Sequence, residues 1–249
     1  KINLVQSLRS SEDYIYKHVL NVAILSAIIA GQMGFPVGRI NLLVKSAILH
    51  DIGALKLQQL PDAEDLDDGT KEVVKKNTQE TLARYGDLDE EVLRLITQMQ
   101  ELYTRESDAE IPVALKESVN ANILYVADAY DRMTAMKSFE EPTSEVKAVR
   151  ELLADEERYN KKIVNALIHG ISILYPGVCV ELSNGEKGLV ITENEDNIFE
   201  PVVLDFRNNN LHDLSDPSVK QTVEIADVMK TMDNRIKLDK SLLEEYQAN

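Results

Sequence analysis

The sequence predicts a mainly α fold: a helical bundle, followed by a small antiparallel β lobe and short C-terminal helices. Two observations carry this prediction. Apolar residues recur at helical spacing through most of residues 11–173, and the pattern changes to a two-residue period after Tyr175-Pro176-Gly177. We therefore expect a helical domain over residues 1–174 and a β-containing lobe over 175–249. A chain of 249 residues with 44% hydrophobic side chains can bury a core of this size.

The helices follow one another with recognisable start and stop signals. Ser11 is an N-cap residue type, and the pattern after it predicts a helix that stops at Gly34. A second helix is expected over about 37–50, and an acidic loop over 61–69. Further helices are expected at about 70–85, 88–102, 114–136, 143–156 and 159–173, with a polar loop at 103–112 between the second and third of these.

The C-terminal lobe begins with an alternating strand at 178–182. Asn184-Gly185 is a strong signal for a tight hairpin turn, and residues 189–191 return as the second strand. Residues 201–206 read as a third strand. Two short helices are expected near 223–231 and 239–246.

Charge and cysteine usage narrow the class of partner. Acidic side chains number 43 against 27 basic ones, for a net charge of −16, which argues against binding to DNA or RNA backbones. Cys179 is the single cysteine, which fits a reducing cytoplasm. The longest apolar stretch, 19–34, is interrupted by polar residues, and no signal peptide is visible, so no membrane insertion is expected.

Two of the four histidines lie on the inward faces of predicted helices: His18 and His50, the latter followed directly by Asp51. Asp128 lies in an otherwise apolar helical segment, where a buried carboxylate requires a partner. A divalent metal is one such partner. Imidazole nitrogens and carboxylate oxygens suit Mn, Fe, Zn or Ni, and they leave positions for a water that the metal would activate. His169 and His212 are interpreted as ordinary structural histidines.

The order of these residues, and the segments around them, resemble the HD superfamily of metal-dependent phosphohydrolases and, more narrowly, its HD-GYP family. The matching segments are residues 16–22, 46–53, 123–131 and 175–185. The resemblance implies a helical domain that binds metal through His18, His50, Asp51 and Asp128. It also implies hydrolysis of cyclic di-GMP, and a cytoplasmic bacterial signalling protein with an upstream sensor domain.

The sequence departs from the family pattern at four positions and in one loop. Where the family has a lysine and three histidines, this chain has Ala54, Asn77, Met99 and Gln100, and the loop that names the family is replaced by an unrelated stretch at 106–112. Amide and thioether groups are poor ligands for hard metal ions, so a second metal is not expected.

Three functions stay open. The first is a regulatory domain with at most one metal. The second is a metal-dependent phosphodiesterase that acts on cyclic di-GMP or another phosphoester, with Asp51 as its catalytic residue. The third is a metal-free helical domain that binds a protein partner. This last alternative predicts that the four residues do not converge and that Asp128 is solvated.

Overall fold

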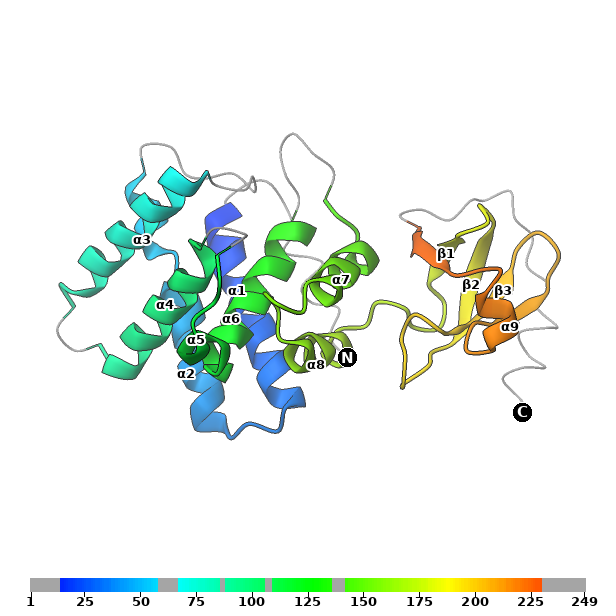
Figure 1. Cartoon of the computed structure of the whole chain (residues 1–249), viewed down its shortest axis with the longest axis horizontal. Coiled ribbons are helices and arrows are strands. Elements are labelled where there is room, and N and C mark those ends of the chain that lie inside the picture. Colours follow the sequence, from blue (N-terminus) through cyan, green and yellow to red (C-terminus); the bar gives the residue numbers. More distant parts are fainter. Residues whose placement is uncertain (1–13, 58–66, 86–87, 106–108, 136–141, 230–249) are drawn as a thin grey trace. The chain divides into compact units, whose positions relative to one another are not determined.

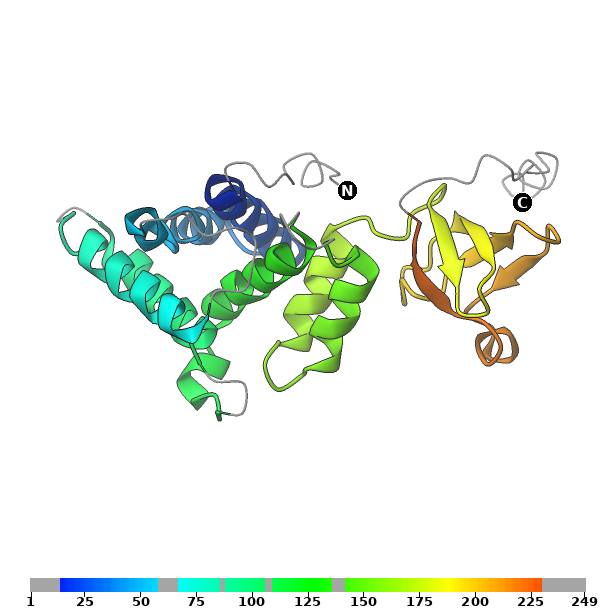
Figure 2. The same ribbon diagram turned by 90° about the horizontal axis from the view of Figure 1, so that it is seen from above.

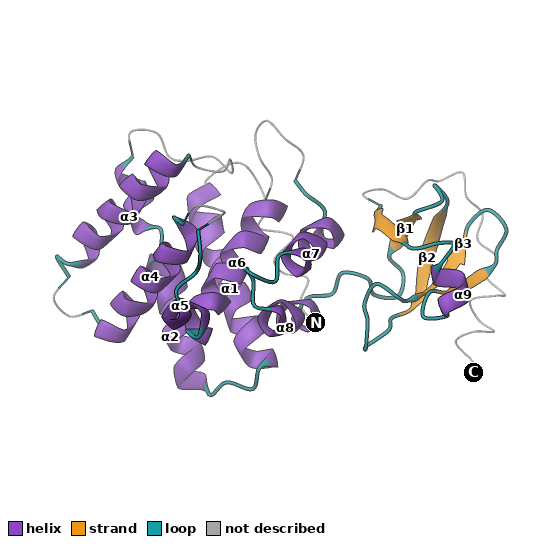
Figure 3. Ribbon diagram, viewed as in Figure 1, coloured by secondary structure: helices purple, strands orange, loops and turns teal. Residues whose placement is uncertain are grey.

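The computed structural model describes residues 14–57, 67–85, 88–105, 109–135 and 142–229. The chain forms two compact units, one of residues 1–143 and 148–171 and the other of residues 144–147 and 172–249. All described strands lie in the second unit, and all long helices come before them in the sequence (Figure 3). The predicted fold class, mainly α with a β lobe, is confirmed.

The described helices agree with most of the predicted ranges. They are α1 (Tyr14–Gln32), α2 (Val37–Leu49), the 3-10 helix η2 (Ile52–Lys56), α3 (Asp68–Leu82), α4 (Glu90–Tyr103), α5 (Val113–Lys116), α6 (Val119–Thr134), α7 (Glu145–Ala154) and α8 (Lys161–Gly170). The side chains of Asp67, Asp89 and Asn160 accept hydrogen bonds from backbone N–H groups and so cap α3, α4 and α8. The expected cap at Ser11 and most of the expected acidic loop lie outside the described residues.

The single helix expected at 114–136 is wrong in one respect, because it is broken into α5 and α6. Ser118 stands between them in a non-helical conformation. The side-chain amide of Asn122 donates to the carbonyl oxygens of Leu115 (2.8 Å) and Ser118 (2.9 Å). These bonds satisfy carbonyl groups that the end of α5 leaves without helical partners, which makes the break stable.

Helix α6 is the central element of the helical unit. It packs against α1, α4 and α8, and α1 lies beside it in both views (Figures 1 and 2). Every residue from Ala121 to Arg132 is buried. A helix buried on all sides has no solvated face for its polar side chains, so Asp128, Asp131 and Arg132 need partners inside the bundle.

Helix α1 is long and apolar enough to cross a membrane, the one such helix in the described part of the chain. Core helices of soluble proteins share these properties, and 56% of its most apolar window is buried inside the helical unit. Its contacts with α2, α6 and α8 bury the polar side chains of His18 and Asn21 together with its apolar ones.

The second unit is a five-stranded antiparallel sheet in the order β4-β3-β2-β1-β5. Its elements are β1 (Cys179–Leu182), β2 (Lys187–Thr192), β3 (Val202–Asp205), β4 (Leu211–Asp213), α9 (Pro217–Lys220) and β5 (Ile225–Val228), and α9 lies outside the sheet (Figure 2). The predicted hairpin is present, with Gly185 at φ 82° in its turn. A positive φ of this kind is why glycine is favoured there.

Two features of the β unit differ from expectation. The helix expected at 223–231 is wrong over residues 225–228, which form β5 and pair with β1, and β4 was not foreseen. Pairing with the edge of β1 satisfies the backbone hydrogen-bonding groups of β5 and buries Ile225. This stabilisation depends on contacts with a distant strand, so the spacing of apolar residues within the segment does not predict it. The helix expected at 239–246 lies outside the described residues.

Candidate metal centre

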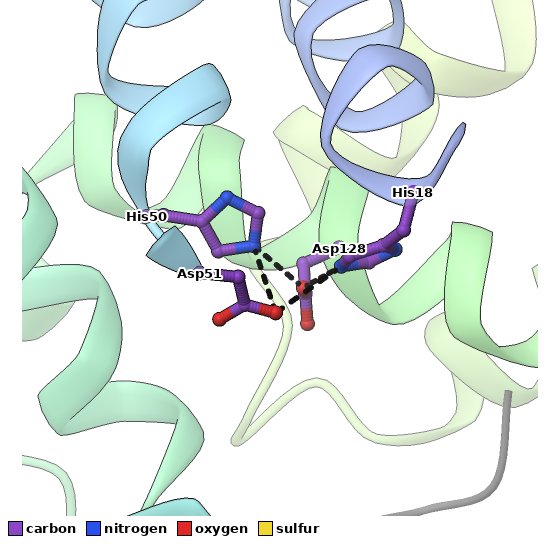
Figure 4. Close-up of side chains that lie close together, drawn as sticks. All are labelled: His18, His50, Asp51 and Asp128. Carbon is purple, nitrogen blue, oxygen red and sulfur yellow. Dashed lines mark hydrogen bonds and ion pairs between the residues drawn. The ribbon is translucent and has the colours of Figure 1, made fainter. Parts of the chain in front are cut away.

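Three helices bring His18, His50, Asp51 and Asp128 together. His18 lies in the second turn of α1, His50 follows the last residue of α2, Asp51 is next in the chain, and Asp128 comes from α6 (Figure 4). Each residue offers one ligand atom, and all four atoms lie within 4.8 Å of one another. We refer to these residues as the four-residue cluster. Asp128 is fully buried, so the two structural expectations of a domain without a site, no convergence and a solvated Asp128, are wrong.

The distances within the cluster are close to the spacing of ligands around one ion. The Nε2 atom of His18 lies 3.0 Å from Oδ1 of Asp128 and 3.7 Å from Oδ2 of Asp51. The corresponding distances from Nε2 of His50 are 3.3 and 3.6 Å. Ligand atoms bound at about 2.1 Å around one metal stand roughly 3.0–3.4 Å apart. Both distances to Asp128 fall in this range, and both distances to Asp51 are slightly longer. The geometry therefore fits a single divalent ion at the centre of the cluster.

The second nitrogen of each imidazole is held by an acceptor. Nδ1 of His18 lies 2.8 Å from Oδ2 of Asp131, whose other oxygen accepts from the Asn21 amide at 2.8 Å. Nδ1 of His50 lies 2.6 Å from the carbonyl oxygen of Ala47. A carbonyl cannot donate, and neither can an ionised carboxylate, so both Nδ1 atoms carry the proton and both Nε2 atoms turn toward the cluster. This is the tautomer that a metal-binding histidine needs.

Arg132 completes the site. Its Nε donates to Oδ2 of Asp128 (2.9 Å), and its Nη2 donates to Oδ2 of Asp51 (2.8 Å). On its other side, the guanidinium carbon lies 4.6 Å from the centre of the Tyr103 ring. The sequence analysis missed Arg132, together with Asp131 and Asn21. The available signal was its spacing, since residue 132 lies four positions after Asp128 and so on the same helix face.

Opposing electrostatic effects act on the ionisable groups. Burial by itself raises the pKa of Asp128, but the Arg132 guanidinium and the hydrogen bonds with His18 and His50 hold it well below its usual range. Burial and Arg132 lower the pKa of His18, whereas its hydrogen bonds with Asp128 and Asp131 prevail and raise it from 6.5 to about 9. The carboxylates are thus charged, and a cation is strongly favoured between them.

The charge of the contacting groups also fits one ion. The set contains three carboxylates, one guanidinium and two imidazoles. Asp51 and Asp128 pair with Arg132, and Asp131 pairs with His18. With both imidazoles neutral, the set carries two negative charges more than positive ones. One divalent cation balances this difference. A buried cluster with an unbalanced charge is costly, so charge and donor type agree.

The four positions that the sequence analysis expects to depart from the family pattern lie in the core or bond to the backbone. Ala54 and Met99 are buried in the core. The side-chain amide of Asn77 donates to the carbonyl oxygen of Gly53 (3.4 Å), and that of Gln100 donates to the carbonyl oxygen of His50 (2.9 Å). Neither amide nitrogen is a metal ligand. The four-residue cluster is the one group of three or more His, Cys, Asp or Glu side chains in the described ranges that can hold a metal.

The other two histidines lie away from the cluster in the sequence. His169 is near the end of α8, where its Nδ1 lies 2.6 Å from the carbonyl oxygen of Asn165. His212 is in β4 of the β unit, 3.5 Å from Asp205. Their interpretation as structural residues agrees with these contacts.

A polar cavity of about 590 Å³ also opens in the helical unit, but it does not include the cluster. It lies at the beginnings of α2 and α6, whereas His50 and Asp128 lie toward the ends of these helices. Its basic side chains Arg39, Lys45 and Arg94 are balanced by acidic ones. The four-residue cluster and this cavity are therefore separate.

Comparison with known proteins identifies the fold around this site. Residues 15–133 match the family model described as the HD domain, and this segment contains the whole four-residue cluster. These residues form an HD domain. The resemblance inferred from the sequence is thereby confirmed at the level of the HD superfamily.

Two curated proteins that are similar to this chain are named cyclic di-GMP phosphodiesterases. One, from Pseudomonas aeruginosa, is 22% identical over 204 residues, which cover 80% of this chain and 49% of the relative. The other, from Borreliella burgdorferi, is 24% identical over 225 residues, which cover 86% of this chain and 58% of the relative. The chain thus spans only about half the length of the curated relatives that it matches.

Proposed function

We propose that this HD domain binds one divalent metal at the four-residue cluster and acts as a regulatory signalling domain. The observation that carries the proposal is the joint geometry of the cluster and Arg132: four ligand atoms around one position, with the two carboxylates also held by a guanidinium. Nε2 of His18, Nε2 of His50 and one carboxylate oxygen each of Asp51 and Asp128 would hold the ion. We propose Mn, Fe, Zn or Ni as the metal.

The chain's own residues prepare the site for this ion. Asp131 and the Ala47 carbonyl oxygen orient the two imidazoles, and Asn21 holds Asp131 in place. When bound, a divalent ion would supply a Lewis acid that polarises a water or a phosphate oxygen.

Three features favour regulation over turnover. No residue of the cluster is more than 5% exposed, which leaves little surface for a substrate as large as a cyclic dinucleotide. Position 54 is an alanine, so it supplies no cation for a phosphate. The chain has four histidines, and the two outside the cluster, His169 and His212, have other partners, Asn165 and Asp205. A protein partner or an upstream sensor domain would then receive or provide the signal, in the cytoplasm of a bacterium.

Metal content tests this proposal directly. Elemental analysis of the purified chain is expected to find about one divalent metal per chain, lost in His50→Ala and in Asp128→Ala. His169→Ala is the matched control, because His169 is exposed and outside the cluster, and this variant should keep the metal. Wild-type protein without metal, or with two ions per chain, would contradict a single-metal site.

A second candidate is a metal-dependent phosphodiesterase that acts on cyclic di-GMP or another phosphoester. The names of both relatives favour it. Under this alternative, Asp51 would be the catalytic carboxylate beside the reacting water. An assay with cyclic di-GMP and added Mn²⁺ or Fe²⁺ decides between the two. The regulatory proposal expects no turnover, and turnover that disappears in Asp51→Asn would establish the enzyme instead.

The third alternative, a metal-free domain that binds a protein partner, would leave Arg132 and a protonated His18 as the cations of the site. It shares the expected absence of turnover with the regulatory proposal. The metal analysis separates them, because only the metal-free domain predicts that wild-type protein and His50→Ala contain equally little metal.

A further inference from the structure

Arg132 contacts the same two carboxylates that would bind the metal. Its Nη2 donates to Oδ2 of Asp51, and this oxygen is also the Asp51 atom that faces both imidazoles. Its Nε donates to Oδ2 of Asp128, while Oδ1 of the same carboxylate faces the imidazoles. The guanidinium therefore binds the Asp128 oxygen that the histidines leave open, and it shares one Asp51 oxygen with them.

We infer that Arg132 is a built-in counterion that competes with the metal for Asp51 and Asp128. This inference rests on the proposed metal site. It adds that a guanidinium already binds the two carboxylates that the ion would use. An arginine suits this role because its planar fork donates to two carboxylates at once and always carries its charge.

The guanidinium is fixed from both sides. The Tyr103 ring of α4 covers one face at 4.6 Å, and the four-residue spacing to Asp128 within α6 holds the side chain along the helix. Arg132 is only 8% exposed. A side chain held this way does not swing into solvent without breaking its contacts with Asp51, Tyr103 and Asp128, so a metal must bind in its presence.

Two consequences follow for metal binding. In the metal-free protein the carboxylates already have a cation, so the cluster stays assembled without a metal. When a divalent ion enters, it meets a positive charge on the same carboxylates, and like charges this close repel. Arg132 should therefore lower the affinity for the metal and make its binding reversible.

The experiment is a calorimetric titration of the metal-free full chain with Mn²⁺. In Arg132→Met, which keeps the length of the side chain and removes its charge, we expect Mn²⁺ to bind roughly tenfold or more tightly than in wild type. The stoichiometry should stay at one ion per chain, because no further ligands become available. Arg132→Lys keeps the charge without the fork, and its affinity should fall between the other two. Arg94→Ala removes an exposed arginine of α4 and should leave the affinity unchanged.

Unchanged or weaker Mn²⁺ binding in folded Arg132→Met would overturn the inference, since Arg132 would then support the ligands instead of competing. Two ions per chain in wild type would overturn the single-metal site on which the inference rests. Wild type without metal and Arg132→Met with one ion would uphold the competition while refuting the proposed occupancy of the native site. No binding in either protein would overturn both. If Arg132→Met does not fold, the comparison of wild type with Arg132→Lys decides, with equal affinities counting against the inference.

Discussion

The imidazole of His18 contacts two carboxylates, Asp131 through Nδ1 and Asp128 through Nε2. With Nδ1 as a donor to Asp131, the Nε2 atom has two ways to approach Asp128 at 3.0 Å. It can carry a second proton, or it can share a metal ion with the carboxylate. A proton and a metal on the same nitrogen exclude each other, so the two ligands compete at this residue.

This competition predicts opposite pH dependences for stability and for metal affinity. The pKa of His18 is raised from 6.5 to about 9 in the folded protein. Its contribution to stability is therefore complete below pH 6.5 and is lost as the pH rises toward 9. In EDTA, we expect the melting temperature to fall over this window, while calorimetry shows that Mn²⁺ affinity rises. His169→Ala should show the same profile. A melting temperature that stays level between pH 6.5 and 9 would contradict the protonation of His18.

Removal of the Arg132 charge has a second expected effect, on stability. Arg132 is buried with Asp51 and Asp128, and the loss of one partner leaves buried charges without compensation. Arg132→Met should lower the free energy of unfolding of the metal-free protein by about 3–5 kcal/mol. Urea denaturation measures this difference, and saturating Mn²⁺ should recover part of it. A change below about 1 kcal/mol would show that the ion pairs contribute little.

At the scale of elements, the segment after α2 is held against α3 at Gly53. The backbone N–H of Gly53 donates to Oγ1 of Thr78 at 3.0 Å, and the Gln100 amide of α4 donates to the carbonyl oxygen of His50. A Cβ atom at Gly53 would stand 2.3 Å from the carbonyl oxygen of Val74 and 2.3 Å from the Thr78 nitrogen. Both are backbone atoms of α3, so the two elements approach this closely only because residue 53 is a glycine.

Gly53→Ala should therefore force η2 away from α3 and disturb His50 and Asp51, which directly precede it. We expect a loss of about 1–3 kcal/mol of stability and weaker Mn²⁺ binding. Gly38→Ala is the matched control: no atom lies within 4 Å of its Cβ position, and the helical site should gain about 0.4–1 kcal/mol. Chemical denaturation and Mn²⁺ titration of both variants check the pair. Equal behaviour of the two alanines would refute the role of the close approach.

At the scale of the whole molecule, the chain forms two compact units, and the four-residue cluster lies in the helical one. Every residue of the cluster, and every hydrogen-bond partner described for it, lies between Tyr14 and Arg132 in the helical unit. The β unit has its own buried residues, among them Val180, Leu182 and Leu204. Each unit therefore has the core that an independently folding domain requires.

A chain that ends at residue 174 should consequently fold and keep the metal site. We expect it to bind one Mn²⁺ per chain with the affinity of the full chain, and calorimetry measures both values. Far-UV circular dichroism provides the control that the fragment is helical. An insoluble fragment, or a folded one without Mn²⁺ affinity, would contradict the proposed division into residues 1–174 and 175–249.

By itself, the sequence determined most helical ranges of the helical unit, the hairpin at Asn184-Gly185 and the four residues of the cluster. These depend on local signals: apolar periodicity, turn residues, and polar side chains in segments that must be buried. The sequence also predicted that Asp128 needs a partner, because this requirement follows from burial alone.

Only the tertiary structure decided which groups meet that requirement. Asp51 and Arg132 are 81 positions apart and bond because α2 and α6 pack in the same bundle. The same holds for Asp131 with His18, and for β5, whose backbone pairs with β1 across the sheet. The spacing of apolar residues along the chain predicts which side chains point inward. Contacts between distant segments depend on how the helices and strands pack. The identity of Arg132 as the cation at the two carboxylates belongs to this second kind of information.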